Sequence, residues 1–171
     1  IRDLLDEADA KGAAGSLGIH GYMANAGYEE VRQAIAENLN ERFETKFTAH
    51  NLVMTVGAAG GLNIIFKTIL DPDDEVIVFA PFFGEYRQYA ANFDAKIVIV
   101  QPNLETFQPD LADLEAKITA RTKALIVNTP NNPTGVIYKP QTMEQIGAIL
   151  EKKQAEFGTD IYLISDEPYR E

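Results

Sequence analysis

The sequence alternates short, nearly continuous apolar runs with longer segments of helical periodicity. Strands with continuous apolar runs are typically buried on both faces of a parallel sheet, with helices packed on each side. The runs that predict strands cover residues 52–56, 75–80, 96–100, 124–127 and 161–165. The segments that predict helices cover residues 28–43, 58–70, 84–92, 110–118 and 141–157. We therefore expect an α/β fold of three layers, α/β/α, built on a largely parallel sheet.

The composition narrows the classes of function. The net charge of −11 argues against a surface for DNA or RNA, because phosphate backbones are bound by clusters of Lys and Arg. The chain has no cysteine and only two histidines, so we expect no metal site. No apolar run approaches the roughly 20 residues that span a bilayer, and no secretory pattern opens the chain. We expect a cytoplasmic protein that binds neither membranes nor nucleic acid.

The alternating elements begin at Tyr22. Residues 1–21 are rich in Gly and Ala and have weak periodicity, so we interpret them as an irregular lead-in segment. Residues 22–171 are predicted to form one domain. The chain begins with Ile1 rather than Met, which suggests that residues are missing at the front.

Chemically informative residues follow the predicted strands. Gly57-Ala58-Ala59 comes after the first strand, Phe83 after the second and Asn132 after the fourth, while Asp166 closes the fifth. Ligands of open α/β sheets bind beyond the carboxyl ends of the strands. We therefore expect these residues to surround one site at one edge of the sheet.

The segment from Gly57 to Leu62 has small residues where a helix is predicted to begin. Backbone N–H groups at such a helix start can approach an anion closely, and the helix dipole adds a favourable field. The structural alternative is a tight turn in which glycines permit close packing. Phe82 and Phe83 have a comparable alternative as core residues, and we assign that role to Phe82.

Two further motifs are more specific. Asn131-Asn132-Pro133-Thr134-Gly135 follows an apolar run, and 34 residues after Asn132 the carboxylate of Asp166 ends another, with Tyr169 three residues later. An Asn-Pro turn or a helix cap would be their ordinary alternatives. With the turn after residue 56 and the segment 80–84, these motifs resemble the cofactor cradle of the fold type I aminotransferases. This aspartate aminotransferase-like group uses pyridoxal 5′-phosphate (PLP).

The resemblance implies a role for each matching residue. The amides of Ala58 and Ala59 would bind the PLP phosphate, beside Gly57, which stands where many relatives have Ser. Phe83 would stack on the pyridine ring. Asp166 would keep the ring nitrogen protonated, because an opposite charge favours the charged form.

The remaining roles concern the ring oxygen and a second subunit. Asn132 and Tyr169 would bind the ring oxygen, and Asn132 would also reach the substrate carboxylate. Tyr22 opens the segment Y-M-A-N-A-G-Y-E-E-V-R-Q-A-I-A, which resembles the family segment whose Tyr reaches the phosphate of the neighbouring subunit. A packed aromatic is the equal alternative for Tyr22. The resemblance therefore implies a homodimer of the full-length protein.

The family also needs a Schiff-base lysine in a Ser-x-x-Lys motif, and none of the nine lysines here lies in such a setting. We therefore expect a front portion of an aminotransferase with a PLP-dependent large domain, inactive alone, whose parent would use an amino acid and a 2-oxo acid. The alternatives are a PLP-dependent lyase or synthase of the same fold, or the aminotransferase-like sensor domain of a transcription regulator. An unrelated nucleotide-binding domain is disfavoured, because its glycine signatures are missing.

Overall fold

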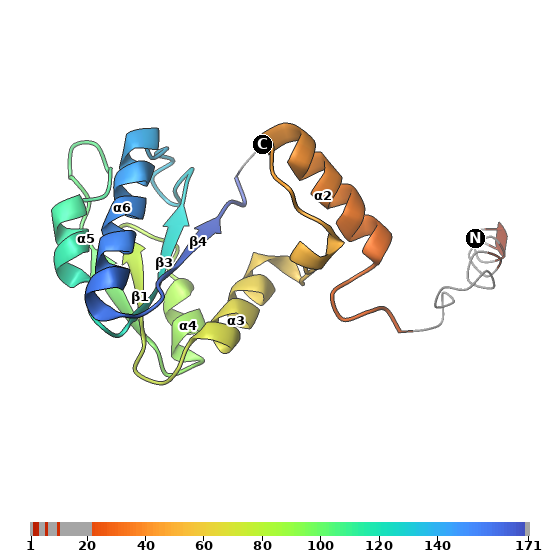
Figure 1. Cartoon of the computed structure of the whole chain (residues 1–171), viewed down its shortest axis with the longest axis horizontal. Helices are drawn as coiled ribbons and strands as arrows, with labels where there is room; N and C mark the ends of the chain where they lie inside the picture. The colour runs from red at the N-terminus through yellow and green to blue at the C-terminus, as the bar shows by residue number, and fades with distance from the viewer. Residues whose placement is uncertain (1, 4–5, 7–9, 11–21, 170–171) are drawn as a thin grey trace. The chain divides into compact units, whose positions relative to one another are not determined.

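The computed structural model describes residues 2–3, 6, 10 and 22–169 (Figure 1). The chain divides into two compact units, Ile1–Val56 and Gly57–Glu171. Residues 2, 3, 6 and 10 are helical, and the rest of the predicted lead-in 1–21 lies outside the described residues. The predicted domain 22–171 therefore contains a further division after Val56.

The first unit is built on α2 (Glu29–Phe43) and η1 (Ala49–Asn51). Buried Arg32 joins them, since its guanidinium donates to the main-chain oxygens of Gly27 (3.3 Å) and Ala49 (2.5 Å). Gly27 has a φ of +95°, and a Cβ there would lie 2.5 Å from the Met54 side chain. Both the backbone conformation and the close contact therefore require glycine.

The prediction of a strand at 52–56 is wrong. Leu52 has extended backbone, but among the described residues this segment has no strand partner, and Met54 N donates to Ala26 O at 2.9 Å. Val53 is 60% exposed and Val56 is 96% exposed. β-branched residues favour extended backbone, but a strand also needs a neighbour that completes its hydrogen-bond ladder.

The second unit contains the remaining eight elements: α3 (Gly57–Ile69), β1 (Glu75–Phe79), α4 (Tyr86–Ala91), β2 (Lys96–Val100), α5 (Leu111–Lys117), β3 (Thr122–Asn128), α6 (Pro140–Phe157) and β4 (Tyr162–Asp166). The sheet has the order β2-β1-β3-β4, and every neighbouring pair is parallel. Together with α2 of the first unit, these elements confirm the other predicted strands and helices to within a few residues at each end.

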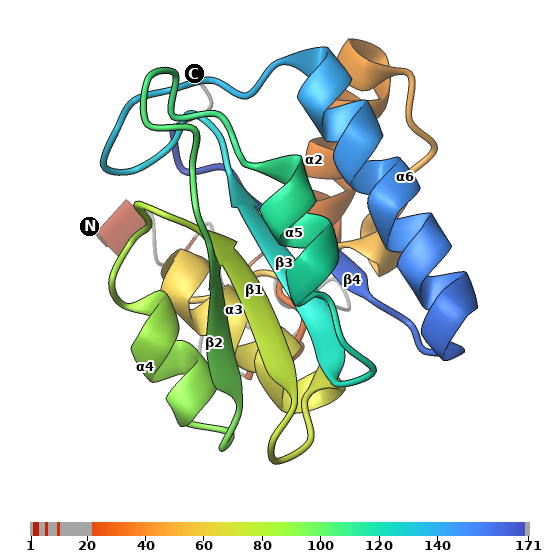
Figure 2. The same cartoon turned by 90° about the vertical axis from the view of Figure 1, so that its left-hand side faces the viewer.

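Two apolar clusters lie on opposite faces of the sheet. Helices α5 and α6 cover one face, and α3 and α4 cover the other (Figure 2). Ile77 and Leu125 belong to the cluster under α5 and α6, while Val76 and Ile126 belong to the cluster under α3 and α4. This is the three-layer α/β/α arrangement that the sequence predicts. The central strands β1 and β3 are buried almost throughout, which explains their continuous apolar runs.

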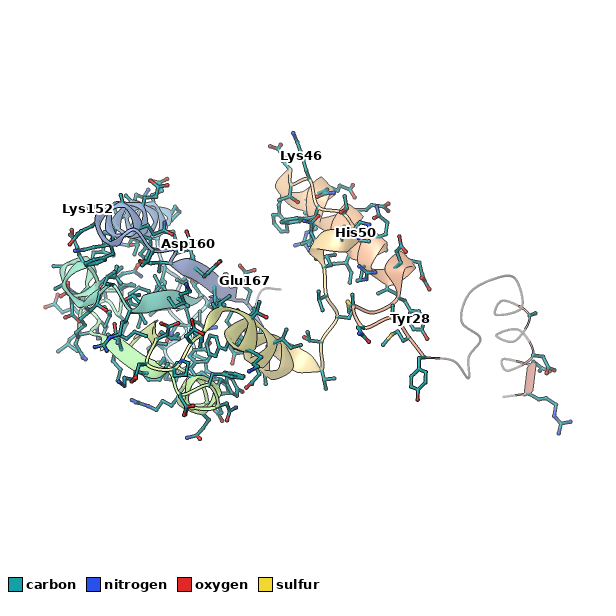
Figure 3. All side chains as sticks on the ribbon, turned by 60° about the horizontal axis from the view of Figure 1, so that its bottom comes forward. Tyr28, Lys46, His50, Lys152, Asp160 and Glu167 are labelled. Carbon is teal, nitrogen blue, oxygen red and sulfur yellow. The ribbon has the colours of Figure 1, made fainter. Side chains whose placement is uncertain are left out.

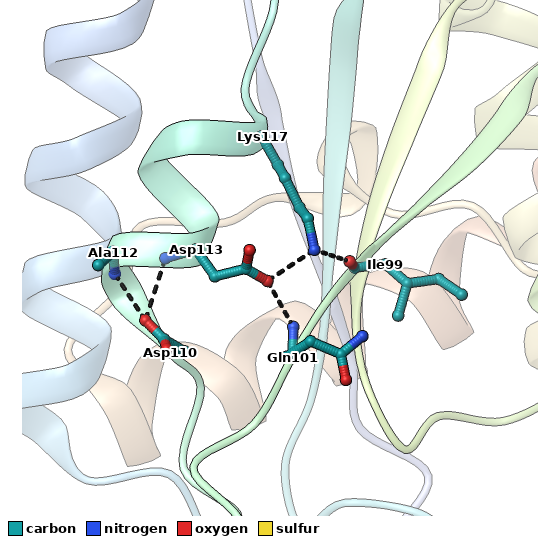
Figure 4. A network of polar contacts seen from close by, with 6 residues as sticks. All are labelled: Ile99, Gln101, Asp110, Ala112, Asp113 and Lys117. Atoms are coloured by element: carbon teal, nitrogen blue, oxygen red, sulfur yellow. Dashed lines mark hydrogen bonds and ion pairs between the residues drawn. The ribbon is translucent and has the colours of Figure 1, made fainter.

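Helix α5 is fixed at its start by Asp110, which caps it. The Asp110 carboxylate accepts from the main-chain N–H groups of Ala112 (2.9 Å) and Asp113 (3.0 Å). Asp113 in turn accepts from the amide of Gln101 and from Lys117 Nζ, each at 2.7 Å (Figure 4). The Lys117 ammonium beside Asp113 lowers the pKa of that carboxyl. Together these contacts join α5 to the end of β2.

We predict that Asp110→Ala lowers the free energy of unfolding by about 1 kcal/mol, because two amides at the helix start lose their acceptor. Chemical denaturation followed by circular dichroism measures this change. The matched control is Asp160→Ala, which removes an exposed carboxylate from the loop before β4 (Figure 3). Equal losses in the two variants would contradict the capping role.

Candidate functional site

A cavity of about 260 Å³ lies where β3 and β4 end in the second unit. Its volume is close to the lower end of the roughly 300–1,000 Å³ that small-molecule sites occupy. The lining residues are Ala58, Ala59, Phe83, Tyr86, Tyr89, Asn128, Asn132, Asp166, Pro168 and Tyr169. The structure thus brings six of the eight predicted site residues to one cavity, Gly57 and Tyr22 being the exceptions.

Among the described residues, Asp166 is the one charged residue that lines the cavity. It is the last residue of β4, and its side chain is partly buried. The hydroxyl of Tyr86 donates to its Oδ2. Burial of the phenol and its hydrogen bond to Asp166 raise the pKa of Tyr86 far above its ordinary value. Tyr86 therefore acts as a fixed donor that orients this carboxylate.

Asn132 and Tyr169 meet at the cavity wall. Asn132 Nδ2 donates to the Tyr169 hydroxyl at 2.8 Å, although the two residues lie 37 positions apart in the chain. A phenol hydroxyl and a carboxamide N–H can each donate a hydrogen bond to a ligand oxygen that lies near both groups. This contact gives the cavity a polar corner near Asp166.

Sequence reasoning missed Asn128, which is buried at the end of β3. Its Nδ2 donates to the main-chain oxygen of Asp166 at 2.9 Å, and its Oδ1 accepts from Asn132 N at 2.7 Å. The sequence feature that could have identified Asn128 is an Asn at the end of an apolar strand. Tyr86 was also missed, and its signal was an aromatic one helical turn beyond Phe83.

The start of α3 contributes two small residues to the wall. Ala58 and Ala59 are exposed in the first turn of this 13-residue helix, so little side-chain bulk covers its first amides. Gly57 precedes them with a φ of +70°, a conformation that glycine adopts at low cost. Gly57 does not line the cavity, and its contribution to this helix start is the backbone turn.

Phe82 and Phe83 have different neighbours. Phe83 lines the cavity and meets Tyr86 edge to face, with ring centroids 5.7 Å apart. Phe82 stacks on Tyr86 at 6.4 Å and lies under the Arg87 guanidinium, while both phenylalanines pack against the cluster under α3 and α4. Both phenylalanines are thus partly buried against this cluster, and of the two only Phe83 lines the cavity.

Asn131 and Tyr22 lie elsewhere. Buried Asn131 bonds within its own loop to Thr134 and reaches the Pro81 oxygen at 3.3 Å, so it shapes the loop that carries Asn132.

Tyr22 belongs to the first unit, where its side chain is 93% exposed. Its contact with a neighbouring subunit stays a prediction.

The lining groups match the chemistry of a planar, phosphorylated heteroaromatic ring. A carboxylate, a paired donor corner, an aromatic wall and an open helix start lie around one space. No cluster of three or more metal-ligating side chains occurs among the described residues. Within the same residues, no helix is both long and apolar enough to cross a membrane.

Comparisons with known proteins identify similar chains. The model of the family described as aminotransferase class I and II matches residues 4–171. A probable aspartate/prephenate aminotransferase of Thermus aquaticus is 38% identical over 150 residues, covering 86% of this chain and 37% of that protein. An aspartate aminotransferase of Thermotoga maritima is 34% identical over 149 residues, covering 86% of this chain and 38% of that protein.

The fold is also that of a solved aminotransferase. The structure of an amino transferase from Eubacterium rectale superposes with a TM-score of 0.87 at 40% identity, covering 98% of this chain and 43% of that one. The chain therefore spans well under half the length of the relatives that it matches.

The raised pKa of Tyr86 predicts a loss of stability in alkali. Since folded Tyr86 keeps its proton to higher pH than the unfolded chain, its contribution is complete below the unfolded pKa of about 10 and is lost as the pH rises above it. In the Tyr86→Phe variant, the free energy of unfolding should therefore decrease less steeply with rising pH above about pH 10. Denaturant titrations at a series of pH values measure this slope.

Tyr138→Phe is the matched comparison, because burial alone raises the pKa of Tyr138 to about 12. Its effect on the alkaline slope should end near pH 12, where folded Tyr138 itself ionises, whereas the effect of Tyr86→Phe should extend to higher pH. An unchanged slope in Tyr86→Phe would contradict the raised pKa of Tyr86, and an effect that ends at the same pH as that of Tyr138→Phe would contradict the contribution of the Asp166 hydrogen bond.

Proposed function

Because the chain belongs to the class I and II aminotransferase family, we propose that it is the PLP-binding portion of an amino-acid aminotransferase, a PLP-dependent enzyme. The observation that carries the proposal is the convergence of Asp166, Asn132 and Tyr169 on one cavity beside the start of α3. Asp166 and Tyr169 lie in one segment of the chain, and Asn132 lies in another, 34 residues before Asp166. Their meeting supports the roles that the sequence motifs suggested.

Asp166 would face the ring nitrogen of the cofactor. PLP, when bound, supplies an electron sink for the negative charge that develops at the substrate α-carbon. A carboxylate held against the ring nitrogen favours the protonated ring, because an opposite charge stabilises the charged form. Tyr86 keeps one oxygen of that carboxylate engaged and thereby limits its rotation.

The other lining residues would position the ring. Asn132 and Tyr169 would donate to its oxygen from the polar corner that they form. Phe83 would cover one ring face, since planar aromatic groups stack favourably. The amides of Ala58 and Ala59, in the first turn of α3, would bind the phosphate with help from the helix dipole.

We further propose the setting of the whole protein. Its substrates would be an amino acid and a 2-oxo acid, and its place cytoplasmic amino-acid biosynthesis. The names of two relatives support an acidic substrate class, since one combines aspartate with prephenate and the other gives aspartate alone. The exposed Tyr22 supports a homodimer, because a tyrosine in a partner's phosphate site has to reach out of its own unit.

The proposal predicts an order of affinities for pyridoxamine 5′-phosphate, a cofactor form without an aldehyde that therefore leaves surface lysines untouched. Asp166→Ala should weaken binding by roughly tenfold or more, because a charge-assisted hydrogen bond to the ring nitrogen is lost. Phe83→Leu should weaken binding less, because it keeps an apolar contact. Isothermal titration calorimetry on the 171-residue chain measures both constants.

The matched control is Asp160→Ala, which removes an exposed carboxylate from the loop before β4 and should leave the affinity unchanged. If the unsubstituted chain does not bind pyridoxamine phosphate, the proposal is refuted for this chain. An Asp166→Ala variant that binds as tightly as the unsubstituted chain would refute the role of Asp166 alone.

We also predict that the 171-residue chain does not transaminate. Among the described residues, no lysine lines the cavity, so none of these lysines is placed to bond covalently to the cofactor. Borohydride reduction with stoichiometric PLP, followed by peptide mapping, should show no preferred lysine. Specific labelling of one lysine, or turnover of an amino acid with a 2-oxo acid, would contradict this prediction.

A further inference from the structure

We propose that Asn128 is a positioning residue that fixes Asp166 and Asn132 relative to each other, so that the cofactor ring meets both at once. The inference rests on the proposed function, because it concerns the use of the same cavity. It assigns to Asn128 a role that no sequence motif indicated. The carboxamide would act through the two neighbouring segments rather than on the substrate.

The position of Asn128 follows from the parallel register of β3 and β4. In this register Asn128 stands opposite Asp166, and each is the last residue of its strand. The main chain of Asp166 therefore lies within reach of the Asn128 side chain. The Nδ2–O distance of 2.9 Å is an ordinary hydrogen bond.

The second bond of Asn128 reaches the loop that follows its own strand. Its Oδ1 accepts from the amide of Asn132 at 2.7 Å, four residues further along. One side chain thus links the end of β4 to the residue that forms the polar corner with Tyr169. The side chain of Asn128 is 6% exposed, so both bonds are largely shielded from water.

A carboxamide is the group that satisfies both neighbours. A main-chain oxygen can only accept and a main-chain N–H can only donate, so the linking side chain needs a donor on one arm and an acceptor on the other. An ionised carboxylate offers acceptors alone, and alanine offers neither. Because the Asp166 oxygen needs a donor and the Asn132 N–H needs an acceptor, the side-chain atom of Asn128 that faces Asp166 is assigned as nitrogen.

Buried Asn131 has a different pattern. It is also 6% exposed, yet its side chain contacts Thr134 in its own loop and the oxygen of Pro81. Neither bond reaches Asp166. Burial of an asparagine in this loop therefore does not by itself produce the link, and the two bonds of Asn128 set it apart.

The test compares three variants of the 171-residue chain by two measurements. The first is hydrogen exchange of the Asn132 amide by NMR without any ligand, and the second is the affinity for pyridoxamine 5′-phosphate. Asn128→Ala should speed the exchange of the Asn132 amide by about tenfold or more and weaken the affinity by a similar factor. Both effects follow from losing the acceptor and the donor together.

Asn128→Asp separates the two halves of the link and carries the test if the alanine variant does not fold. It keeps an acceptor for the Asn132 amide, so the slow exchange should persist. It places a carboxylate oxygen against the main-chain oxygen of Asp166, so the affinity should still fall by about tenfold. A purely structural asparagine would not separate the two measurements.

Thr122→Val is the matched control at the opposite end of β3. Thr122 is 1% exposed, and its hydroxyl accepts from Thr119 N at 2.9 Å. The variant should lower the melting temperature, while Asn132 exchange and the affinity stay unchanged.

The outcomes distinguish the inference from the proposed function. Lack of binding by the unsubstituted chain overturns the proposed function, and the inference with it. Binding by the unsubstituted chain together with unchanged affinity in both Asn128 variants overturns the inference alone. An affinity loss in Thr122→Val that equals the loss in Asn128→Ala would also overturn it, because general destabilisation would then explain both.

Discussion

The parallel ladder between β3 and β4 is the constraint on which the candidate site depends. Parallel neighbours bring equivalent ends of their strands to the same edge, so the register that pairs Ala124 with Tyr162 also pairs Asn128 with Asp166. A slip of one residue would reverse the faces of β4 and turn Ile164 out of the apolar cluster under α3. The hydrophobic pattern that selects the register thus also places the carboxylate, and packing and site geometry share one cause.

Burial of both sheet faces determines what surrounds that edge. Because β1 and β3 have apolar side chains on both faces, helices must cover each side. On one of these faces, α3 packs through Leu62 and Phe66, and its first turn reaches the cavity with Ala58 and Ala59. Tyr86 belongs to the same cluster, yet its hydroxyl leaves the apolar surroundings to meet Asp166. The apolar cluster that holds the Tyr86 ring therefore also positions its hydroxyl against Asp166.

Much of the fold could be predicted because its signals are local. Strand runs, the Asp110 cap and Pro140 at the start of α6 each act through the nearest few residues. The strand predicted at 52–56 is absent from the described fold because its apolar residues have no ladder partner, which is a non-local property. Asp166, Asn132 and Phe83 were found by their places after strands. Asn128 and Tyr86 were missed because their importance lies in contacts 38 and 80 positions away.

The charge of the molecule limits how the proposed site can bind an anion. A net charge of −11 repels a phosphorylated ligand at long range, and the described residues of the cavity lining include one carboxylate and no Lys or Arg. Attraction would therefore have to come from short-range donors, chiefly the first amides of α3 with the helix dipole. Such donors have fixed directions, unlike a flexible ammonium group. A phosphate bound there would be held at a fixed distance from Asp166, so the same helix start that supplies affinity would also set where the ring lies against the carboxylate.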